Sequence, residues 1–340
     1  MAGLLQTENI DYSLVICAYN PDYGIFRRCL EAVALLDRTG ITTETIVVDN
    51  NSQPPLDRSG LIAEYSGAIP GLKIITARQQ GVQYARMAAI RASRGYRIVY
   101  FDYDNEPDAD YLQELKKLNE QYPGVGAWGP GKVTVEFTGP VDPLLQEYAR
   151  RAFQERHEHS LQTAMEKEWQ PCYPFGTGLC SLRSVLEEYV TLAGSGALTL
   201  EGRKGKRLSS GEDTQMVLLA IRSGYAAGVA PQLKLQHLVP SARVSIPYLK
   251  RLAYGTSVCY ETCLLQVFPE RRPLLQSRLL TPGRFVRRSL KKWIGAGFGR
   301  AVFKTFDLAA YIGLHEGAYK ALGKKAPRPV KWLSNYLELE

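Results

Sequence analysis

Two aspartates, Asp102 and Asp104, stand two residues apart at the end of an apolar run that begins at Arg97. The run is rich in β-branched and aromatic residues, so it predicts a buried strand, and open α/β sheets bind ligands at the carboxyl ends of their strands. Paired carboxylates suit a divalent cation that completes its coordination with water and substrate phosphates. The segment Asp104-Asn-Glu-Pro107 is also good turn chemistry, so a plain turn is the alternative interpretation.

A second acidic pair, Glu212 and Asp213, precedes a helix predicted over 214–223. Acidic residues at a helix N-terminus interact favourably with the helix dipole, so helix capping is one explanation of the pair. The other explanation is chemical, because a carboxylate within hydrogen-bond reach of a reacting hydroxyl can accept its proton. No Ser-His or Cys-His signature of a nucleophilic enzyme accompanies these residues.

The elements that must position these carboxylates follow from the hydrophobic periodicity. It predicts strands over 11–20, 43–48, 72–76 and 96–101 and helices over 23–36 and 81–94. This alternation predicts a mostly parallel sheet with right-handed crossovers. Later segments comprise helical patterns over 141–170 and 241–260 and a loop rich in Gly, Lys and Arg over 194–211.

The order of these motifs resembles the family 2 glycosyltransferases of the GT-A fold over about residues 11–240. The resemblance is carried by Val15-Ile-Cys-Ala-Tyr-Asn20, Ile46-Val-Val-Asp-Asn-Asn-Ser52, Gln80-Gly81 with Ala85-Arg86, Phe101-Asp-Tyr-Asp104 with Pro107, Gly176-Thr-Gly178 and Gly211-Glu-Asp213. It implies a Rossmann-like, mostly parallel central sheet flanked by helices. It also implies an enzyme that transfers a sugar from a nucleotide diphosphate donor with inversion, binding the donor within about 11–125 and the acceptor within about 126–240.

The resemblance implies a role for each matching residue on the donor side. Ala18, Tyr19 and Asn20 would line the nucleotide pocket. Asp49 would hydrogen-bond the base, and Arg86 would approach the base or the phosphates. This chain has Cys17-Ala-Tyr-Asn20 where many relatives have Pro-Thr-Tyr-Asn, so contacts through residue 18 fall to backbone or packing.

The resemblance also implies a metal site and a base. Asp104 would bind Mn²⁺ or Mg²⁺, and Asp102 would contact the ribose or a metal-bound water. His237 follows the last predicted strand and is a candidate third protein ligand, with a structural histidine bonded to backbone as the alternative. Asp213 would be the general base and Glu212 would orient the acceptor or its neighbour.

Composition bounds the class of protein. The chain of 340 residues is 45% hydrophobic and 22% charged, which is typical of a globular protein. Its six cysteines have no paired zinc-ligand spacing, so we expect reduced core thiols. The N-terminal residues lack the pattern of a signal peptide, and no apolar run reaches the roughly 18 to 20 residues that span a bilayer. These features predict a cytoplasmic protein.

The positive charge is concentrated at the C-terminal end. Residues 271–340 contain 15 Lys and Arg against 4 Asp and Glu, a net of +11, whereas the whole chain carries +8. We expect a basic helical extension over 241–340, following a catalytic domain over 1–240. The segment 284–300 mixes cations with aromatic residues, which favours contact of residues 281–340 with an anionic membrane, at the inner face of the cytoplasmic membrane. The alternative is a solvated helix packed on the catalytic domain. No nucleic-acid recognition motif accompanies the basic residues.

The favoured function is therefore a metal-dependent glycosyltransferase acting on a hydroxyl of a glycan or lipid-linked acceptor. A sugar-nucleotide pyrophosphorylase is one alternative, but it needs a Gly-rich phosphate loop after the first strand, where this chain has Ala18-Tyr-Asn-Pro-Asp22. A non-catalytic, membrane-associated nucleotide-sugar binding protein is the other, although such a protein has no use for a base at Asp213. The donor nucleotide, the sugar and the oligomeric state do not follow from the sequence.

Overall fold

A computed structural model describes residues 10–203, 208–294 and 301–340. Within these ranges, ten strands form one sheet in the order β3-β2-β1-β4-β9-β6-β10-β5, with β7 paired to β6 and β8 paired to β10. The strands are β1 (Tyr12–Ala18), β2 (Thr43–Asp49), β3 (Leu72–Thr76), β4 (Arg97–Asp102), β5 (Asn105–Pro107), β6 (Val125–Phe137), β7 (Arg156–His157), β8 (Gln162–Ala164), β9 (Cys180–Leu182) and β10 (Ala226–Val239).

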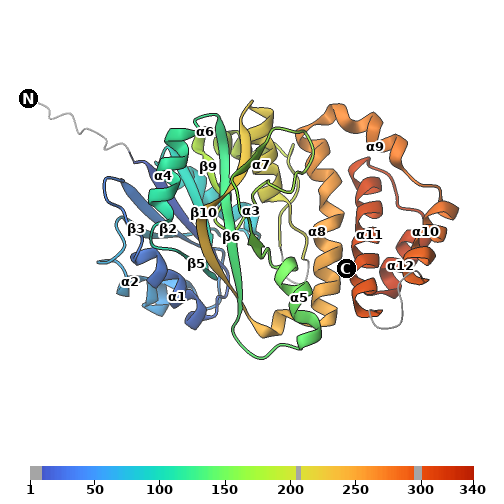
Figure 1. Cartoon of the computed structure of the whole chain (residues 1–340), viewed down its shortest axis with the longest axis horizontal. Coiled ribbons are helices and arrows are strands. Elements are labelled where there is room, and N and C mark those ends of the chain that lie inside the picture. The colour runs from blue at the N-terminus through green and yellow to red at the C-terminus, as the bar shows by residue number, and fades with distance from the viewer. Residues whose placement is uncertain (1–9, 204–207, 295–300) are drawn as a thin grey trace, which may run out of the picture.

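Helices surround this sheet and continue beyond it at the C-terminal end (Figure 1). They are α1 (Tyr23–Ala34), α2 (Leu61–Glu64), α3 (Val82–Ala92), α4 (Tyr111–Gln121), α5 (Pro143–Ala152), α6 (Arg183–Gly194), α7 (Glu212–Arg222), α8 (Ile246–Val267), α9 (Arg272–Arg278), α10 (Pro282–Ile294), α11 (Ala301–Ala321) and α12 (Arg328–Tyr336). Short 3₁₀ turns occur at Leu56–Ser59, Ser241–Arg243 and Pro269–Arg271.

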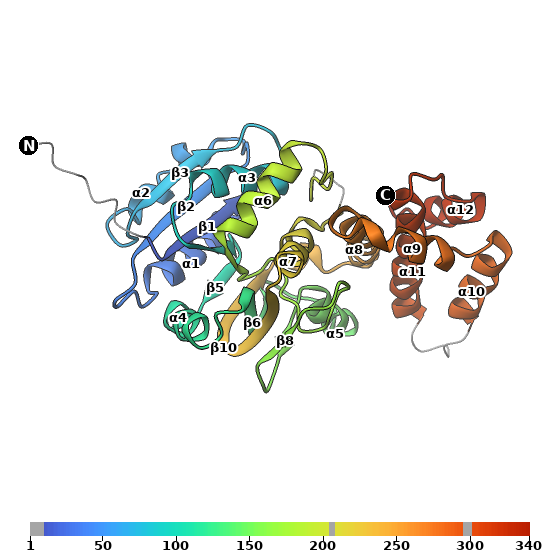
Figure 2. The same cartoon turned by 90° about the horizontal axis from the view of Figure 1, so that it is seen from above.

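The predicted parallel sheet is confirmed. Strands β3, β2, β1 and β4 run parallel, as do β6 and β10, whereas each antiparallel pairing joins only two or three residue pairs. Helices cover both faces of the sheet because its strands are apolar on both sides. Figure 2 shows α3 and α6 over one face and α1 and α4 over the other, and each face has its own buried core.

The segment 141–170 departs from its helical prediction. Only α5 is helical, and the chain then returns to the sheet through β7 and β8. His157 and His159, expected on a polar helix, lie on β7 and in the bend after it, both exposed. The polar periodicity here comes from an edge of the sheet, where short strands also expose alternate residues.

The C-terminal extension is helical, as predicted, and packs on the rest of the chain through α8. Helix α11 runs beside α8 (Figure 1), and the backbone of α8 lies against Gly313 and Gly317 of α11. A Cβ atom on Gly313 would lie 2.7 Å from the carbonyl oxygen of Tyr254, so the close approach of the helices requires glycine. The helix predicted over 241–260 begins later, at Ile246 after the 3₁₀ turn, and extends to Val267.

All six cysteines are free and five of them are buried, which confirms the expectation of unpaired core thiols. In the described part of the chain, none of the helices combines the length and the apolar character that crossing a bilayer requires.

Candidate active site

Three strand ends meet at one edge of the sheet and bring the predicted donor residues together. Ala18 pairs with Asp49 of β2, and its neighbour Cys17 pairs with Asp102 of β4. The carboxyl ends of β1, β2 and β4 are therefore level, as expected for a ligand site in a parallel sheet. Tyr19, which follows β1, is partly exposed at this edge.

The loop after β2 is built by buried polar side chains. The carboxylate of Asp49 accepts hydrogen bonds from the backbone N–H groups of Ser52 (2.8 Å) and Leu56 (2.9 Å). The side chain of Asn50 donates to the carbonyl oxygen of Gln79 (2.8 Å) and accepts from the N–H of Gly81 (2.8 Å), which ties β2 to the start of α3. Asn20 accepts from the N–H of Gln53 (2.8 Å). Asp49 and Asn20 thus shape the wall of the site, and their contact with a nucleotide stays a prediction.

The two aspartates of the first acidic pair have different surroundings. The carboxylate of Asp104 is buried and accepts from the side-chain amide of Asn105 (3.3 Å). The carboxylate of Asp102 lies 3.5 Å from the hydroxyl of Thr177. Burial, together with the charge of Asp104, raises the pKa of Asp102. Burial would also raise the pKa of Asp104, but the charges of His237 and Arg243 lower it overall. Asp104 is therefore the more acidic member of the pair.

His237 of β10 faces Asp104 because β10 pairs antiparallel with β5, which places His237 opposite Asn105. Its Nδ1–H donates to the carbonyl oxygen of Phe153 (2.8 Å), so Nε2 is the nitrogen that faces Oδ1 of Asp104, at 3.7 Å. Burial alone lowers the pKa of His237, but Asp104 and the bond to Phe153 raise it overall. The two alternatives for this histidine, a bond to backbone and a ring nitrogen that faces the aspartate, are thus both present in one residue.

These two residues fit a divalent cation. A carboxylate is the ligand that Mn²⁺ and Mg²⁺ prefer, and a ligating histidine commonly donates its other N–H to a carbonyl oxygen. Among the residues described, however, no group of three or more His, Cys, Asp or Glu side chains could hold a metal ion. The expected ligand set of Asp104, His237 and Asp102 stays a prediction. The other ligands of a bound cation would be phosphate and water.

The second acidic pair opens α7. Gly211 precedes it with φ of +140°, and a Cβ atom there would lie 2.6 Å from the sulfur of Cys263, so only glycine suits this entry to the helix. Asp213 is partly exposed, and its Oδ2 accepts from the N–H of Gly176 (3.0 Å). Glu212 is buried with Oε1 3.7 Å from Nη1 of Arg86. Burial raises the pKa of Glu212, and Arg86 only partly offsets this shift.

Arg86 connects the two acidic pairs. Its buried guanidinium lies over the ring of Tyr100, 5.2 Å from the centroid, and is influenced by the charges of Glu212, Asp213 and Asp102. Its Nη1 has no hydrogen-bond partner in the described structure. The predicted approach of Arg86 to a base or phosphate remains a proposal. In this structure its partners are the carboxylates.

The turn Gly176-Thr177 joins the acidic pairs from the other side. The N–H of Gly176 donates to Asp213, and the hydroxyl of Thr177 contacts Asp102. A Cβ atom on Gly176 would lie 2.7 Å from Nη2 of Arg86, so the close contact between this turn and Arg86 requires glycine.

Sequence reasoning missed two cations of the site. Arg243 donates from Nη1 to Oδ2 of Asp104 (3.0 Å) and from Nη2 to the hydroxyl of Tyr103 (2.7 Å). The charge of Arg203, in the loop after α6, acts on Asp102 and Glu212. The position of Arg243 soon after His237, at the end of the last strand, was a signal, but its basic surroundings favoured assigning it to the C-terminal extension.

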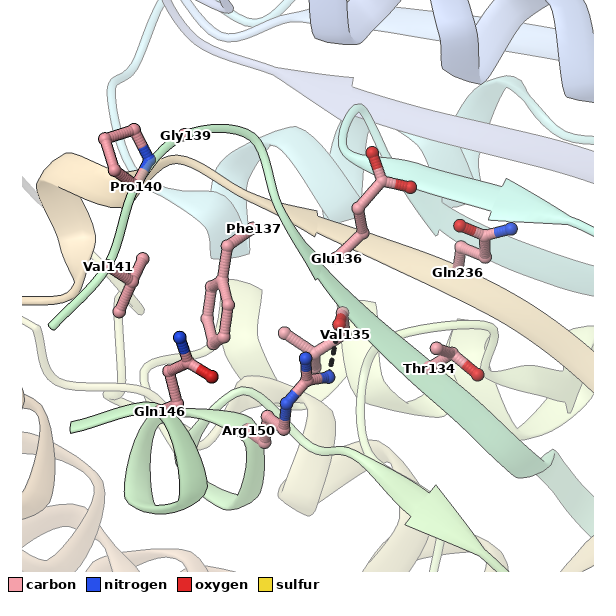
Figure 3. A pocket seen from close by; sticks show the side chains of 10 residues that line it. All are labelled: Thr134, Val135, Glu136, Phe137, Gly139, Pro140, Val141, Gln146, Arg150 and Gln236. Carbon is pink, nitrogen blue, oxygen red and sulfur yellow. Dashed lines mark hydrogen bonds between the residues drawn. The ribbon is translucent and has the colours of Figure 1, made fainter. Parts of the chain in front are cut away.

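A separate hollow of about 570 Å³ lies between the end of β6 and α5 (Figure 3). Arg150 lies over the ring of Phe137, 5.1 Å from the centroid, and donates to the carbonyl oxygen of Val135 (2.6 Å). None of the residues predicted to bind donor, metal or acceptor proton lines it. It falls within the range expected to face the acceptor.

Comparison with known proteins agrees with this geometry. The chain is 26% identical over 259 residues to an N-acetylglucosaminyltransferase of Rhizobium meliloti (strain 1021), covering 74% of this chain and 56% of the relative. It is 24% identical over 253 residues to an N-acetylglucosaminyltransferase of Mesorhizobium japonicum, with the same two coverages. The chain thus spans little more than half the length of these curated relatives.

A solved mannosyltransferase from Pyrobaculum calidifontis, in complex with GDP-Man and Mn²⁺, shares the fold. It has a TM-score of 0.50 and 17% identity, over 97% of this chain and 80% of that one. The family model described as glycosyl transferase family 2 matches residues 13–189, more than half of the chain. The chain belongs to glycosyl transferase family 2, with the GT-A fold.

Proposed function

We propose that this protein is a metal-dependent, inverting glycosyltransferase that moves a sugar from a nucleotide diphosphate donor to a hydroxyl group. One observation carries the proposal: the turn at Gly176-Thr177 contacts both acidic pairs, through Asp213 on one side and Asp102 on the other. A group proposed for the donor and a group proposed for the acceptor proton thus border the same turn.

The donor side consists of the strand ends and the first acidic pair. Ala18, Tyr19, Asn20 and Asp49 would border the nucleoside, and Asp102 its ribose. Asp104 and His237 would hold Mn²⁺ or Mg²⁺, and the ion would neutralise charge on the departing diphosphate. The second nitrogen of His237 is already oriented by its bond to Phe153, so the ligand needs no rearrangement.

The acceptor side is the start of α7. Asp213 is the more accessible acid and would take the proton of the incoming hydroxyl as the new bond forms. Glu212 is buried against Arg86, so its part would be to hold that guanidinium beside Asp213. Inversion requires a single displacement, for which one base suffices and no enzyme nucleophile is needed.

The substrates are proposed from the relatives. Because both curated relatives are N-acetylglucosaminyltransferases, we propose N-acetylglucosamine as the first sugar to test. The acceptor would be a growing surface glycan or a lipid-linked oligosaccharide, and it would reach Asp213 from the side of residues 126–240.

The test separates donor binding from turnover. Release of the nucleoside diphosphate from UDP-, GDP- and TDP-sugars, including UDP-N-acetylglucosamine, is measured for the native protein and for Asp213→Asn. The variant should bind the donor normally and lose about 10²- to 10⁴-fold in turnover, the usual contribution of a general base. Asp110→Asn, a change at an exposed aspartate that makes no helix-cap bond, is the matched control. Normal turnover by Asp213→Asn would remove this residue as the base.

We also propose that α10 contacts an anionic membrane surface. Phe285 and Ser289 of this helix are buried, and Phe285 stacks on Tyr311 of α11 at 5.6 Å. A second stripe is exposed, with Leu290 at 53% and Trp293 at 48% exposure. The exposed cations Arg284, Arg287, Arg288 and Lys291 lie on the same helix. Such a helix suits the interface of an anionic bilayer.

The membrane proposal is tested by sedimentation with phosphatidylglycerol liposomes. The double variant Leu290→Glu with Trp293→Glu leaves the packed stripe intact and should bind at least about tenfold more weakly, since burying one such side chain contributes about 1.5–3 kcal/mol. Leu35→Glu, at a leucine that directly follows α1 and is 73% exposed, is the control. Equal sedimentation of all three proteins would reject α10 as the contact. Glycines 295, 297 and 299, which follow α10 in the sequence, lie outside the described residues.

A further inference from the structure

Arg243 forms an ion pair with the carboxylate of Asp104, which the proposed function assigns to the metal. Its Nη1 lies 3.0 Å from Oδ2 of Asp104, while Nε2 of His237 lies 3.7 Å from Oδ1. The side chain of Asp104 is only 5% exposed, so a cation can reach it only from the few directions that these neighbours leave. Both oxygens of Asp104 therefore face a cationic or cation-binding group of the chain itself.

The position of Arg243 suits movement. It ends the 3₁₀ turn Ser241–Arg243, which contributes no buried residue, and its own side chain is 25% exposed. Its second anchor is the hydroxyl of Tyr103, at 2.7 Å. A guanidinium held by two bonds at the rim of the site can rotate into solvent without opening the core.

A guanidinium and a divalent cation cannot both bind Oδ2 of Asp104, because like charges at such a distance repel strongly in a site with little water. A diphosphate beside that oxygen would, in turn, offer the planar guanidinium two anionic oxygens for the paired hydrogen bonds that arginine prefers.

We propose that Arg243 is a displaceable internal counter-ion. It neutralises Asp104 while the site holds no donor, yields Oδ2 to the divalent cation, and then pairs with the diphosphate of the donor. Metal and donor should therefore bind cooperatively. The metal displaces Arg243 from Asp104, and the diphosphate of the donor pairs with the displaced Arg243. The inference rests on the proposed function for the identity of the diphosphate, and on geometry alone for the competition between Arg243 and the metal.

Titration of Mn²⁺ into the protein of residues 1–340 without nucleotide, followed by calorimetry, tests the competition. Arg243→Met removes the charge and keeps much of the side-chain volume, so Mn²⁺ should bind at least about tenfold more tightly than to the native protein. The double variant Arg243→Met with Asp104→Asn should lose this gain. Equal or weaker Mn²⁺ binding by Arg243→Met would overturn the proposal.

Tyr103→Phe provides a second route, because it removes one anchor of the guanidinium without touching the carboxylate. It should tighten Mn²⁺ binding by a smaller factor than Arg243→Met does. Native affinity for Mn²⁺ in both Tyr103→Phe and Arg243→Met would overturn the proposal. With Mn²⁺ present, inorganic pyrophosphate should bind Arg243→Met more weakly than the native protein. If the gain in Mn²⁺ affinity occurs but no nucleoside diphosphate binds any form of the protein, the proposed function fails while the competition stands.

Discussion

Replacing Gly176 with alanine places one methyl group between the two groups that the account assigns to the acceptor side. The new Cβ would lie 2.7 Å from Nη2 of Arg86 and 3.0 Å from Oδ2 of Asp213, where ordinary van der Waals contact begins at 3.4 Å. Arg86 must therefore retreat by about 0.7 Å and Asp213 by about 0.4 Å.

The expected effect on activity is larger than the effect on stability. The atoms that must move are the ends of side chains, so the free energy of unfolding should fall by only about 1 kcal/mol, at the low end for overpacking. A displacement approaching 1 Å at a reacting group can lower turnover about 10²-fold. We expect donor binding to stay within a few-fold of native, since the first acidic pair is untouched.

The assay is release of nucleoside diphosphate from the donor, alongside urea unfolding monitored by circular dichroism. Gly124→Ala is the matched control, because a Cβ atom there meets no atom within 4 Å. A folded Gly176→Ala protein with turnover within about twofold of native would refute the assignment of Arg86 and Asp213 to the reaction centre.

Two further changes test the fold that supports the site. Gly317→Val should lower the free energy of unfolding by about 2–3 kcal/mol, because a Cβ atom at Gly317 would lie 2.9 Å from the carbonyl carbon of Val258 and would force α11 off α8. Gly283→Val is the control, because the space around Gly283 is open and the free energy of unfolding should stay close to native. Equal stability of the two variants in urea titrations would contradict the packing of α11 on α8. Buried Glu44 accepts from Ser13 (2.7 Å), Lys73 (2.9 Å) and the N–H of Arg94 (2.6 Å), and although burial raises its pKa these bonds lower it overall. A lowered pKa in the folded state adds stability that is present above the unfolded pKa of about 4.5 and is lost as the pH falls through the folded value. Glu44→Gln should therefore be less stable than the native protein at pH 7, and its free energy of unfolding should fall less steeply between about pH 5 and pH 3 in urea titrations. Glu120→Gln, at an exposed glutamate, is the control. A pH dependence as steep in Glu44→Gln as in the native protein would contradict the role of Glu44.

The strand ends of the site were predictable because each follows from a local pattern. Apolar runs that stop at Asn20, Asp49 and Asp102 mark the carboxyl ends of parallel strands, and parallel pairing makes those ends level. Helix α7 was predicted within two residues of its start, since Gly211 and the acidic pair are start signals.

The partners of these residues were not predictable, because they lie far apart in the chain. Arg243 and Asp104 are separated by 139 positions, and only the antiparallel pairing of β10 with β5 brings them together. The motif predicts Arg86 near the nucleotide, which stays a prediction, but its ion pair with Glu212 of α7 could not be predicted from the sequence. The strands β7 and β8 were missed because two- and three-residue strands carry too little periodicity to distinguish them from a helix.

The central claim is that a metal and a nucleotide diphosphate bind together at Asp104. The most direct measurement is thermal unfolding of the native protein and of Asp104→Ala with UDP, GDP and TDP, each with and without Mn²⁺. A ligand at 100 times its dissociation constant stabilises the folded state by about 2.7 kcal/mol, so binding is visible as a raised melting temperature. One nucleotide should raise the melting temperature of the native protein with Mn²⁺ and should fail to do so for Asp104→Ala. A melting temperature unchanged by every nucleotide, or raised equally in the variant, would contradict the claim.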